Sequence, residues 1–359
     1  MTDAAAVLDP ASVQALLART GVPDPADAPA LRWGVLAPGG IAHKFVDAVH
    51  SYTAGRVVAA ASRDADRARA FAQVHGIPRA YAGYDRLVAD PEVDAVYVAS
   101  PHSAHLAHAV LAIEAGKHVL VEKALARNLA EVDRIFAAAA AHRVFAMEAM
   151  WTRHLPHIAL VREWVAQGRV GQVVSVVADH GQSLDLEATH RLKDPTLAGG
   201  ALLDLGVYPI SFVVDLLGAP WGVHATGHRT ETGVDATSAI TLEYPDPVVA
   251  QASCTLLTKT PTTAVVAGTA ARIELEGDFY APTRLQLISA DRGLDPQAAV
   301  LETVDARVPN GFQFQVAEAA RCITAGLAES PRMDWESSRT VMRAMDTVRA
   351  QLGVRYPGE

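Results

Sequence analysis

Three residues with side chains suited to proton transfer are Lys123, Asp204 and Tyr208. Lysine is scarce, five against 26 arginines, and Lys123 comes just after a predicted buried strand, His118–Val121. Ligands of open α/β sheets bind at the carboxyl ends of the strands, where Lys123 would lie. Asp204 and Tyr208 are four residues apart in a predicted helix, Ala201–Leu217, so both project from one face. A phenol whose pKa is lowered from about 10 by a nearby ammonium can relay a proton for an alcohol or a carbonyl.

Each of these residues also has a purely structural interpretation. A lysine just past a strand is commonly a surface residue, and an aspartate at a helix start commonly caps the helix. A tyrosine at a helix start commonly packs in the core. The three residues therefore indicate an active site only if the fold brings them together.

A glycine-rich turn, Ala37-Pro-Gly-Gly-Ile-Ala42, lies between a predicted strand that begins at Leu31 and a predicted helix. Such turns let the backbone approach a pyrophosphate, and the following helix N-terminus supplies N–H donors. Ala37 stands where the first glycine of this motif usually is, so the pattern reads A-x-G-x-x-A. Pro-Gly-Gly is also an ordinary turn, but its place at the start of a βαβ unit favours a dinucleotide site.

The end of the second predicted strand, Val57–Ala61, bears on which dinucleotide binds. About 20 residues past the glycines, an NAD site offers a carboxylate to the ribose 2′-hydroxyl. This sequence offers Ser62 and Arg63, with Arg67 one helical turn later. A hydroxyl and guanidinium groups suit a 2′-phosphate, so these positions favour NADP, with NAD as the alternative. Asp64 is the one nearby carboxylate.

The histidines do not have the spacing of a metal site. His102, His105 and His108 are spaced i, i+3, i+6, and His102 is expected in a loop, so the three do not share one helix face. Zinc pairs on a helix usually have i, i+4 spacing with an acid nearby. No metal site is predicted, and the sequence has neither a Gly-x-Ser-x-Gly elbow nor a Gly-Lys-Thr phosphate loop.

The elements that must position these residues alternate between strand and helix in the first 150 residues. Apolar runs separated by helical stripes predict a parallel sheet covered on both faces, that is, a Rossmann-type doubly wound domain. After Trp151 the pattern changes to consecutive strands with two helices among and after them, which predicts an α+β domain with a large, mostly antiparallel sheet. The predicted parts are an N-terminal extension, a dinucleotide-binding domain, an α+β substrate and oligomerisation domain, and a C-terminal helix and tail, over residues 1–30, 31–150, 151–335 and 336–359.

Composition narrows the class of protein. The chain has 359 residues, enough for roughly two domains, and 40 acidic against 31 basic residues give a net charge of −9. An acidic chain argues against nucleic-acid or anionic-membrane partners. Cys254 and Cys322 cannot form a disulfide framework. With no export signal and no apolar run of membrane length, we expect a cytoplasmic enzyme.

Several segments together resemble the glucose–fructose oxidoreductase / inositol dehydrogenase / MocA family of oxidoreductases. The resemblance extends from about Leu31 to Pro357. Within the family, the sequence is similar to the branch that holds dimeric dihydrodiol dehydrogenase and NADP-dependent D-xylose 1-dehydrogenase. It rests on GVLAPGGIAHKF, ASRDADRARAFA, SPHSAHLAHAVLAIEAGKHVLVEKAL, MEAMWTRHLP, RLKDPTLAGGALLDLGVYPISF and GFQFQVAEAARCITAGLAESPRMDWESS. Ala124 replaces the customary proline after Glu-Lys.

The resemblance implies roles for particular residues. Lys123 and Tyr208 would form the catalytic pair, with Asp204 assisting. The pyrophosphate would lie on Gly39, Gly40, Ile41 and Ala42, and the adenosine phosphate on Ser62, Arg63 and Arg67. Ser100, Pro101, His102, His105 and Glu122 would line the nicotinamide riboside. Trp151 and Arg153 would lie where cofactor and substrate meet.

The resemblance implies an NADP-dependent oxidoreductase that acts on a sugar, such as the aldose D-xylose, or on a vicinal diol. A keto-sugar reductase, an inositol dehydrogenase and a non-catalytic nucleotide sensor are the alternatives. Its partners would be a small-molecule substrate and copies of itself, as a homodimer or homotetramer formed through the C-terminal sheet.

Overall fold

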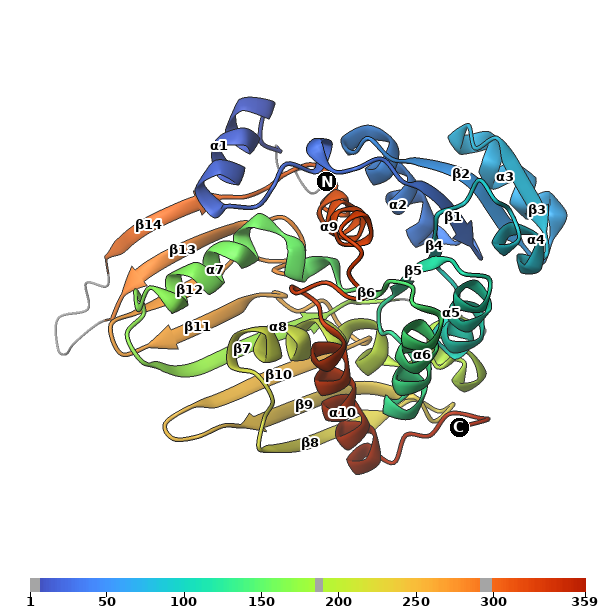
Figure 1. Ribbon diagram of the computed structural model, residues 1–359. Helices are drawn as coiled ribbons and strands as arrows, with labels where there is room; N and C mark the ends of the chain where they lie inside the picture. Colours follow the sequence, from blue (N-terminus) through green and yellow to red (C-terminus); the bar gives the residue numbers. More distant parts are fainter. Residues whose placement is uncertain (1–6, 185–189, 291–298) are drawn as a thin grey trace.

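The computed structural model describes residues 7–184, 190–290 and 299–359. Within them the chain forms two β-sheets that lie side by side, with helices around and between them (Figure 1). The first sheet has six strands and the second has eight. Both parts of the predicted fold class, a doubly wound parallel sheet and an α+β region with a mostly antiparallel sheet, are confirmed.

The first sheet is entirely parallel. Its strands are β1 (Arg32–Leu36), β2 (Arg56–Ser62), β3 (Arg79–Ala82), β4 (Ala95–Val98), β5 (His118–Glu122) and β6 (Ala146–Ala149). The connections hold α2 (Gly40–Tyr52), α3 (Ala65–His75), α4 (Tyr84–Val88), η2 (His102–Ala104), α5 (His105–Glu114) and α6 (Leu129–His142). The strand order is β3-β2-β1-β4-β5-β6. The chain adds β2 and β3 on one side of β1 and then returns to add β4, β5 and β6 on the other side, so the order reverses between β1 and β4. Ligands of such sheets bind outside the carboxyl ends of the strands at this reversal.

The apolar strands predicted from the sequence form the centre of this sheet because they are buried on both faces. All four residues of β4 are buried, as are the last four of β5. Two elements were not predicted from the sequence: β3, at the edge of the sheet, and α4, which packs on β1 and β2.

The second sheet is antiparallel except at one pairing. Its strands are β7 (Val173–Gly181), β8 (Gly222–Arg229), β9 (Asp235–Glu243), β10 (Val249–Thr255), β11 (Ala264–Gly268), β12 (Ala271–Leu275), β13 (Arg284–Ser289) and β14 (Val300–Asp305). Their order is β14-β13-β12-β11-β7-β10-β9-β8, and β7 pairs with β10 in parallel. The sequence analysis missed β8 and β14, one at each edge.

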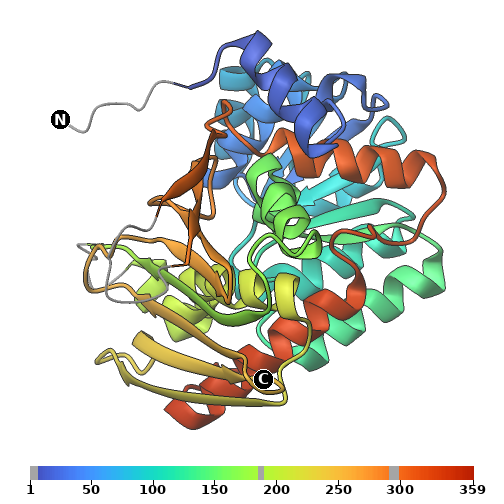
Figure 2. The ribbon, with the colours of Figure 1, turned by 90° about the vertical axis from the view of Figure 1, so that its left-hand side faces the viewer.

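Helices cover one side of the second sheet (Figure 2). Helix α8 (Val207–Leu217) packs on β7 and β10, and α10 (Trp335–Leu352) packs on β8, α8 and α6. The remaining segments of this half are η3 (Trp151–His154), α7 (Pro156–Ala166), η4 (Arg191–Lys193), η5 (Pro195–Leu197), η6 (Leu202–Gly206) and α9 (Gln313–Thr324). Since α10 contacts elements of both sheets, it joins the two halves of the molecule.

The predicted helix before α8 departs from regular geometry. Residues Leu202–Gly206 form a π-helical turn before α8 begins at Val207. Gly206 lies so close to Cys254 that a Cβ atom on it would be 2.9 Å from the sulfur. Asp204 is therefore in a widened turn and not, as predicted, in the same regular helix as Tyr208.

The N-terminal segment is folded onto the rest of the molecule. Its helix α1 (Pro10–Thr20) packs against α7, and the short turn η1 (Pro25–Asp27) packs against α9. The backbone N–H of Leu8 donates to the carbonyl of Arg307, next to β14. The domain boundaries expected at residues 30, 150 and 335 stay predictions.

One described segment, Pro195–Leu217, is long and apolar enough to cross a membrane by length and composition alone. In its most apolar stretch, 89% of the residues are buried inside the molecule. This segment is part of the protein core.

Candidate active site

Lys123 lies where the two halves of the molecule meet. It follows β5 directly, and its side chain is 12% exposed. Its Nζ donates a hydrogen bond to the backbone carbonyl of Asp204 at 2.7 Å and lies 3.6 Å from the Asp204 Oδ1 atom. The same Nζ lies 4.9 Å from the centre of the Tyr208 ring. The fold thus brings together the three residues that the sequence analysis singled out.

Asp204 is held as a carboxylate by two cations. Arg191 donates to Asp204 Oδ1 at 3.1 Å, on the same oxygen that Lys123 approaches. Burial opposes ionisation, but Lys123 and Arg191 together lower the pKa of Asp204 below its ordinary value. A fixed negative charge beside Lys123 orients the ammonium.

The widened turn around Asp204 depends on Asp235. The backbone N–H of Leu202 donates to Asp235 Oδ2 at 2.5 Å. Gly200 approaches the same carboxylate with a φ of +113°, where an added Cβ would lie 2.3 Å from Oδ1. Only glycine fits this backbone and this approach, so the Gly199-Gly200 pair sets the entry to the turn.

Among the described residues, one donor reaches the hydroxyl of Tyr208. Trp151 Nε1 donates a hydrogen bond to Tyr208 Oη at 3.1 Å, and both side chains are buried. Tyr208 lies in the first turn of α8, whereas Trp151 begins η3, just after β6. The hydrogen bond therefore links the end of the parallel sheet to the helix of the second sheet.

The expected lowering of the Tyr208 pKa is not found. Burial raises the pKa of Tyr208 above its ordinary value, and the negative charge of Glu122 raises it further. Lys123 Nζ lies 4.9 Å from the centre of the ring, but its charge does not offset the effect of burial on the pKa. The hydrogen bond from Trp151 acts in the opposite direction, because it stabilises a phenolate oxygen. At neutral pH the phenol is protonated.

His102 and His105 hold the backbone around Lys123. His102 contacts the carbonyl of Lys123 through Nε2 at 3.3 Å, and His105 contacts the carbonyl of Ala124 through Nδ1 at 3.0 Å. The peptide bond between Lys123 and Ala124 is cis. Burial lowers the pKa of His102 to about 3 and that of His105 to about 4, so both rings are neutral at physiological pH. The structure gives these histidines a positioning role on the Lys123 loop.

Ser100 and Pro101 precede these histidines at the carboxyl end of β4. The carbonyl of Ser100 lies 2.7 Å from His105 Nε2. The buried Ser100 hydroxyl has no hydrogen-bond partner among the described residues. Their predicted place beside a nicotinamide riboside stays a prediction.

Glu122 is a buried carboxyl next to Lys123. It accepts a hydrogen bond from the Tyr97 hydroxyl on β4. Burial raises the pKa of Glu122 to about 7. The carboxyl therefore changes charge near neutral pH, in contrast to the permanently ionised Asp204.

The glycine-rich turn has the form of a phosphate-binding turn. Gly39 caps α2 without a side-chain hydrogen bond, and a Cβ atom on Gly39 or on Gly40 would meet no atom within 4 Å. Ala37 adopts a φ of +55°, a conformation that favours glycine. Ala42 is fully buried and Ile41 is 38% exposed at the start of the helix. Open space before uncapped helix N–H groups fits a pyrophosphate.

The polar residues at the end of β2 fit the 2′-phosphate interpretation. Arg63 and Arg67 are exposed, and neither takes part in an ion pair within the described ranges. Asp64 caps α3 by accepting from the backbone N–H groups of Asp66 and Arg67 at 2.8 and 3.2 Å. The Ser62 hydroxyl accepts from the backbone N–H of Asp64 at 3.2 Å. Since the Asp64 carboxylate is bound at the helix start, it does not compete for a ribose.

Arg153 is not part of the Tyr208 cluster. Its Nε donates to the Ser211 hydroxyl at 3.1 Å, and its Nη1 lies 3.7 Å from Asp215. The residue is 4% exposed, so the guanidinium is enclosed between η3 and α8. The prediction that Arg153 touches cofactor or substrate finds no support in this geometry.

The sequence analysis missed an aromatic group beside Tyr208. The His180 ring stacks on the Tyr280 ring at 4.3 Å, and the Tyr280 ring lies 4.6 Å from that of Tyr208. Burial, together with the charge of Lys123, lowers the pKa of His180 to about 4. Alternation of buried residues along β7 was the available signal, because it places His180 on the inner face with Val176 and Ala178.

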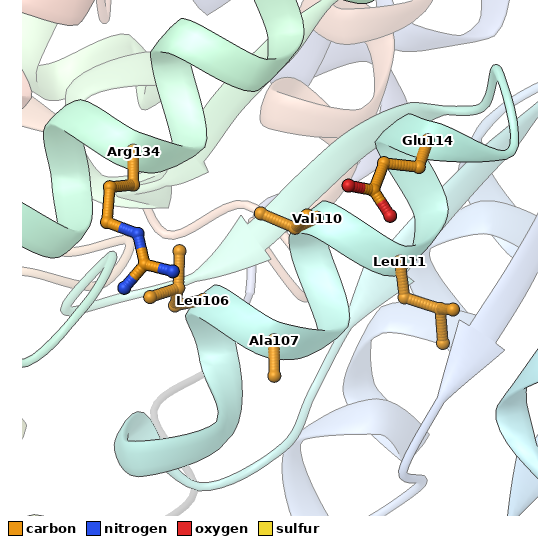
Figure 3. A pocket seen from close by; sticks show the side chains of 6 residues that line it. All are labelled: Leu106, Ala107, Val110, Leu111, Glu114 and Arg134. Atoms are coloured by element: carbon orange, nitrogen blue, oxygen red, sulfur yellow. The ribbon is translucent and has the colours of Figure 1, made fainter. Parts of the chain in front are cut away.

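Three surface hollows formed by described residues lie away from this cluster. Figure 3 shows one between α5 and α6, about 280 Å³ in volume, with Arg134 of α6 beside Leu106 of α5. Its lining is mostly apolar and holds no residue of the Lys123 cluster. Among residues 7–184, 190–290 and 299–359, no group of three metal-ligating side chains is found.

Two family models match the chain. Residues 31–150 match the oxidoreductase family with an NAD-binding Rossmann fold, and residues 158–274 match the GFO/IDH/MocA C-terminal domain. The first match covers the parallel sheet and the second covers β7 to β12.

Similar proteins include trans-1,2-dihydrobenzene-1,2-diol dehydrogenases. The protein from Danio rerio is 38% identical over 337 residues, covering 91% of this chain and 98% of its own length. The Homo sapiens protein is 34% identical over 332 residues, with coverages of 91% and 98%. Among solved structures, a 3-ketoreductase from Actinomadura kijaniata in complex with NADP and TDP-benzene is 27% identical, with a TM-score of 0.79 and coverages of 90% and 98%.

Proposed function

The chain belongs to the GFO/IDH/MocA family of NAD(P)-dependent oxidoreductases, and on that premise we propose that it transfers a hydride between NADP and a hydroxyl-bearing carbon of a sugar or a vicinal diol. The observation that carries the proposal is the meeting of Lys123 and Tyr208. Lys123 comes from the end of a parallel strand and Tyr208 from the helix of the other sheet, yet the ammonium lies 4.9 Å from the phenol ring.

The residues of the first sheet fit a dinucleotide with a 2′-phosphate. Gly39 and Gly40 leave open space before α2 for a pyrophosphate. Arg63 and Arg67 offer exposed guanidinium groups, and the carboxylate of Asp64 is turned to its own helix. The 3-ketoreductase of similar fold was solved with NADP, which supports this assignment. NAD remains the alternative cofactor.

NADP, when bound, supplies the acceptor or donor of the hydride. The protein moves the proton. In the reductive direction the Tyr208 hydroxyl donates its proton to the carbonyl oxygen of the substrate, and in the oxidative direction the Tyr208 phenolate accepts the proton of the substrate hydroxyl. Because burial keeps the phenol protonated at neutral pH, the cluster as it stands is poised for the reductive step.

Lys123 and Trp151 support the charge that this proton transfer creates. When Tyr208 becomes a phenolate, the Trp151 N–H already points at its oxygen. The Lys123 ammonium supplies a positive charge beside the ring and a donor for the reacting oxygen. Asp204 keeps that ammonium in place from the opposite side.

Two observations bear on the substrate. The relatives at 34–38% identity are dihydrodiol dehydrogenases, which favours a vicinal diol or a sugar with neighbouring hydroxyls. The similarity to a 3-ketoreductase favours a keto-sugar as the second candidate. The same Lys123 and Tyr208 chemistry serves both, since the reactions differ only in direction and in the carbon that reacts.

A substrate panel tests the proposal. The purified protein is incubated with NADP and pentoses, hexoses, inositols or cyclic trans-diols, and reduction is followed by the near-ultraviolet absorbance of NADPH. Turnover of an aldose or a diol, with NADP preferred over NAD, is the expected result. Turnover of inositols alone would support the inositol alternative, and tight NADPH binding without any turnover would indicate a nucleotide sensor.

We also propose that the second sheet joins two copies of the chain. Val177 on β7 and Val249 on β10 are 40% and 49% exposed, and a hollow of about 470 Å³ on the sheet is lined mainly by small side chains. A flat face of this kind suits sheet-to-sheet packing. Light scattering on the wild type and on Val177→Glu tests this, with a dimer or tetramer expected to dissociate in the variant. A location in the cytoplasm stays a prediction.

A further inference from the structure

Lys44 is a half-buried cation that the proposed proton transfer does not use. It projects from α2, the helix that follows the glycine-rich turn. Its Nζ lies 4.1 Å from the centre of the Trp151 ring and 4.8 Å from that of Phe312. Burial lowers the pKa of Lys44 below its ordinary value. Among the described residues, Nζ has neither a hydrogen-bond acceptor nor a carboxylate within 4 Å.

The carboxyls near Lys44 are engaged elsewhere. Glu122 is the only one that contributes to its pKa, and it lies beyond ion-pair distance, accepts from Tyr97 and has its own pKa raised to about 7. Asp204 already serves both Lys123 and Arg191. The cluster therefore holds more fixed positive than fixed negative charge, and the half-buried Lys44 ammonium, with three donors, has no acceptor among the described residues.

Lys44 Nζ lies close to the residues that we propose transfer the proton. Trp151, over which Lys44 lies, is the residue whose indole N–H donates to Tyr208 Oη. Phe312 begins the segment that leads into α9. The base of the Lys44 side chain is fixed, because Asn310 Nδ2 donates to the Lys44 carbonyl at 3.1 Å. The ammonium is thus directed to the second half of the molecule, one indole ring away from the proton-transferring phenol.

We infer that Lys44 binds a carboxylate on the substrate, so that the preferred substrates are sugar acids or other hydroxy acids that carry an anionic group away from the reacting hydroxyl. The inference rests on the proposed function and specifies its substrate class. Aromatic faces partly replace the water that the ammonium loses, and a carboxylate supplies the missing acceptor. Neutral sugars leave the ammonium unpaired in the complex.

The test compares uronic acids with the matching neutral hexoses. D-Glucuronate and D-glucose, and D-galacturonate and D-galactose, are assayed with NADP for the wild type, Lys44→Met and Lys44→Arg. Methionine keeps the packing of the stem on Trp151 and removes the charge. We expect kcat/KM of the wild type to favour the uronates by about tenfold or more, Lys44→Met to remove that preference, and Lys44→Arg to restore part of it. Activity on neutral hexoses and the NADPH dissociation constant should not change.

The outcomes separate the inference from the proposed function. If the wild type oxidises neutral sugars as well as uronates, the substrate class is wrong and the proposed function stands. If Lys44→Met weakens NADPH binding and slows both classes equally, Lys44 serves the cofactor phosphates and the inference is wrong. If neither a sugar nor a cyclic trans-diol is turned over, the proposed function fails. Calorimetry then decides the inference, which is supported by uronate binding to the NADP-loaded wild type but not to Lys44→Met, and is overturned by equal binding or none.

Discussion

Trp151 and Arg153 lie two residues apart on η3, and both donate hydrogen bonds to α8, but the two contacts have different chemistry. Trp151 donates to the hydroxyl of Tyr208, a group that can gain and lose a proton. Arg153 donates to the Ser211 hydroxyl and forms an ion pair with Asp215. Both donors are almost fully buried, at 3% and 4% exposure.

The difference shows that burial alone does not mark a functional residue. The buried guanidinium of Arg153 forms an ion pair with the buried carboxylate of Asp215. Arg162 approaches the same carboxylate at 2.7 Å. At Tyr208 the contacts do not balance, because burial and Glu122 raise the pKa of the phenol and only the hydrogen bond from Trp151 lowers it. We therefore expect changes at the first contact to alter stability and changes at the second to alter catalysis.

The largest expected effect comes from Lys123→Ala and Tyr208→Phe. Each removes a group that binds or protonates the reacting oxygen, so kcat should fall by about 10²- to 10⁴-fold while NADPH affinity is retained. Steady-state kinetics and a fluorescence titration of NADPH measure the two quantities. Near-normal turnover in either variant would remove that residue from the mechanism.

A matched control lies at the other end of the same helix. The Tyr244 hydroxyl donates to the carbonyl of Gly218, just after α8, at 2.9 Å. Tyr244→Phe also deletes one buried hydroxyl that contacts this helix. Its kcat should stay close to that of the wild type, and a loss similar to that of Tyr208→Phe would point to a general effect on α8.

The expectation that the Arg153 contact stabilises the fold is tested by Arg153→Met. The variant leaves Asp215 buried with Arg162 as its remaining partner, so the free energy of unfolding should fall by about 3 kcal/mol, at the lower end for a broken buried pair. Urea unfolding measures the loss. Arg343→Ala is the control, because that pair with Glu336 is 3.6 Å long and more than half exposed, and should change stability by less than about 1 kcal/mol.

The expectation that the Trp151 contact affects catalysis is tested by Trp151→Phe. Loss of the indole N–H removes a donor that favours the phenolate, so the pKa of Tyr208 should rise further. Oxidation needs the phenolate, and its pH–rate profile should therefore move to higher pH by about one unit. An unchanged profile with a lower kcat at every pH would mean that Trp151 only packs against the ring.

The smallest effect is expected at Arg63, which belongs to neither the Trp151 contact nor the Arg153 contact. Arg63→Ala should raise the KM for NADP about tenfold and leave the KM for NAD nearly unchanged, because only NADP carries the 2′-phosphate. Asp66→Ala, at the exposed start of α3, serves as a control for changes to the helix itself. Equal effects of Arg63→Ala on both cofactors would contradict the 2′-phosphate assignment.

Local patterns placed Lys123 after a strand and Tyr208 on a helix, but the pairing of the two residues was predicted from the family resemblance. The apolar run before Lys123 could only be a buried strand, and the helical stripe around Tyr208 indicated a helix. Contacts between distant segments had no such signal. The hydrogen bond between Trp151 and Tyr208 spans 57 residues, and no local spacing encodes it. The raised pKa of Tyr208 was also beyond the sequence, since it depends on burial by the folded chain.

Missed elements share a physical cause. In β8 the outward residues His224, Thr226 and His228 are exposed, and the inward ones include Gly227, so the strand has no strong apolar alternation. The π-helical turn at Leu202–Gly206 depends on the close approach of Gly206 to Cys254, a residue from another strand. Edge strands and irregular turns are decided by neighbours that a linear pattern does not include.

The single parallel pairing in the second sheet has a topological consequence for catalysis. A hairpin cannot connect β7 to β10 in parallel, so the chain has to travel back over the sheet before β10 can begin. The connection from β7 to β8 makes this return and carries Asp204 and Tyr208, and its helix α8 packs on β7 and β10. If β7 and β10 were antiparallel, no such path would be needed. The chain would then have no α8 at this place to position the Tyr208 phenol near Lys123.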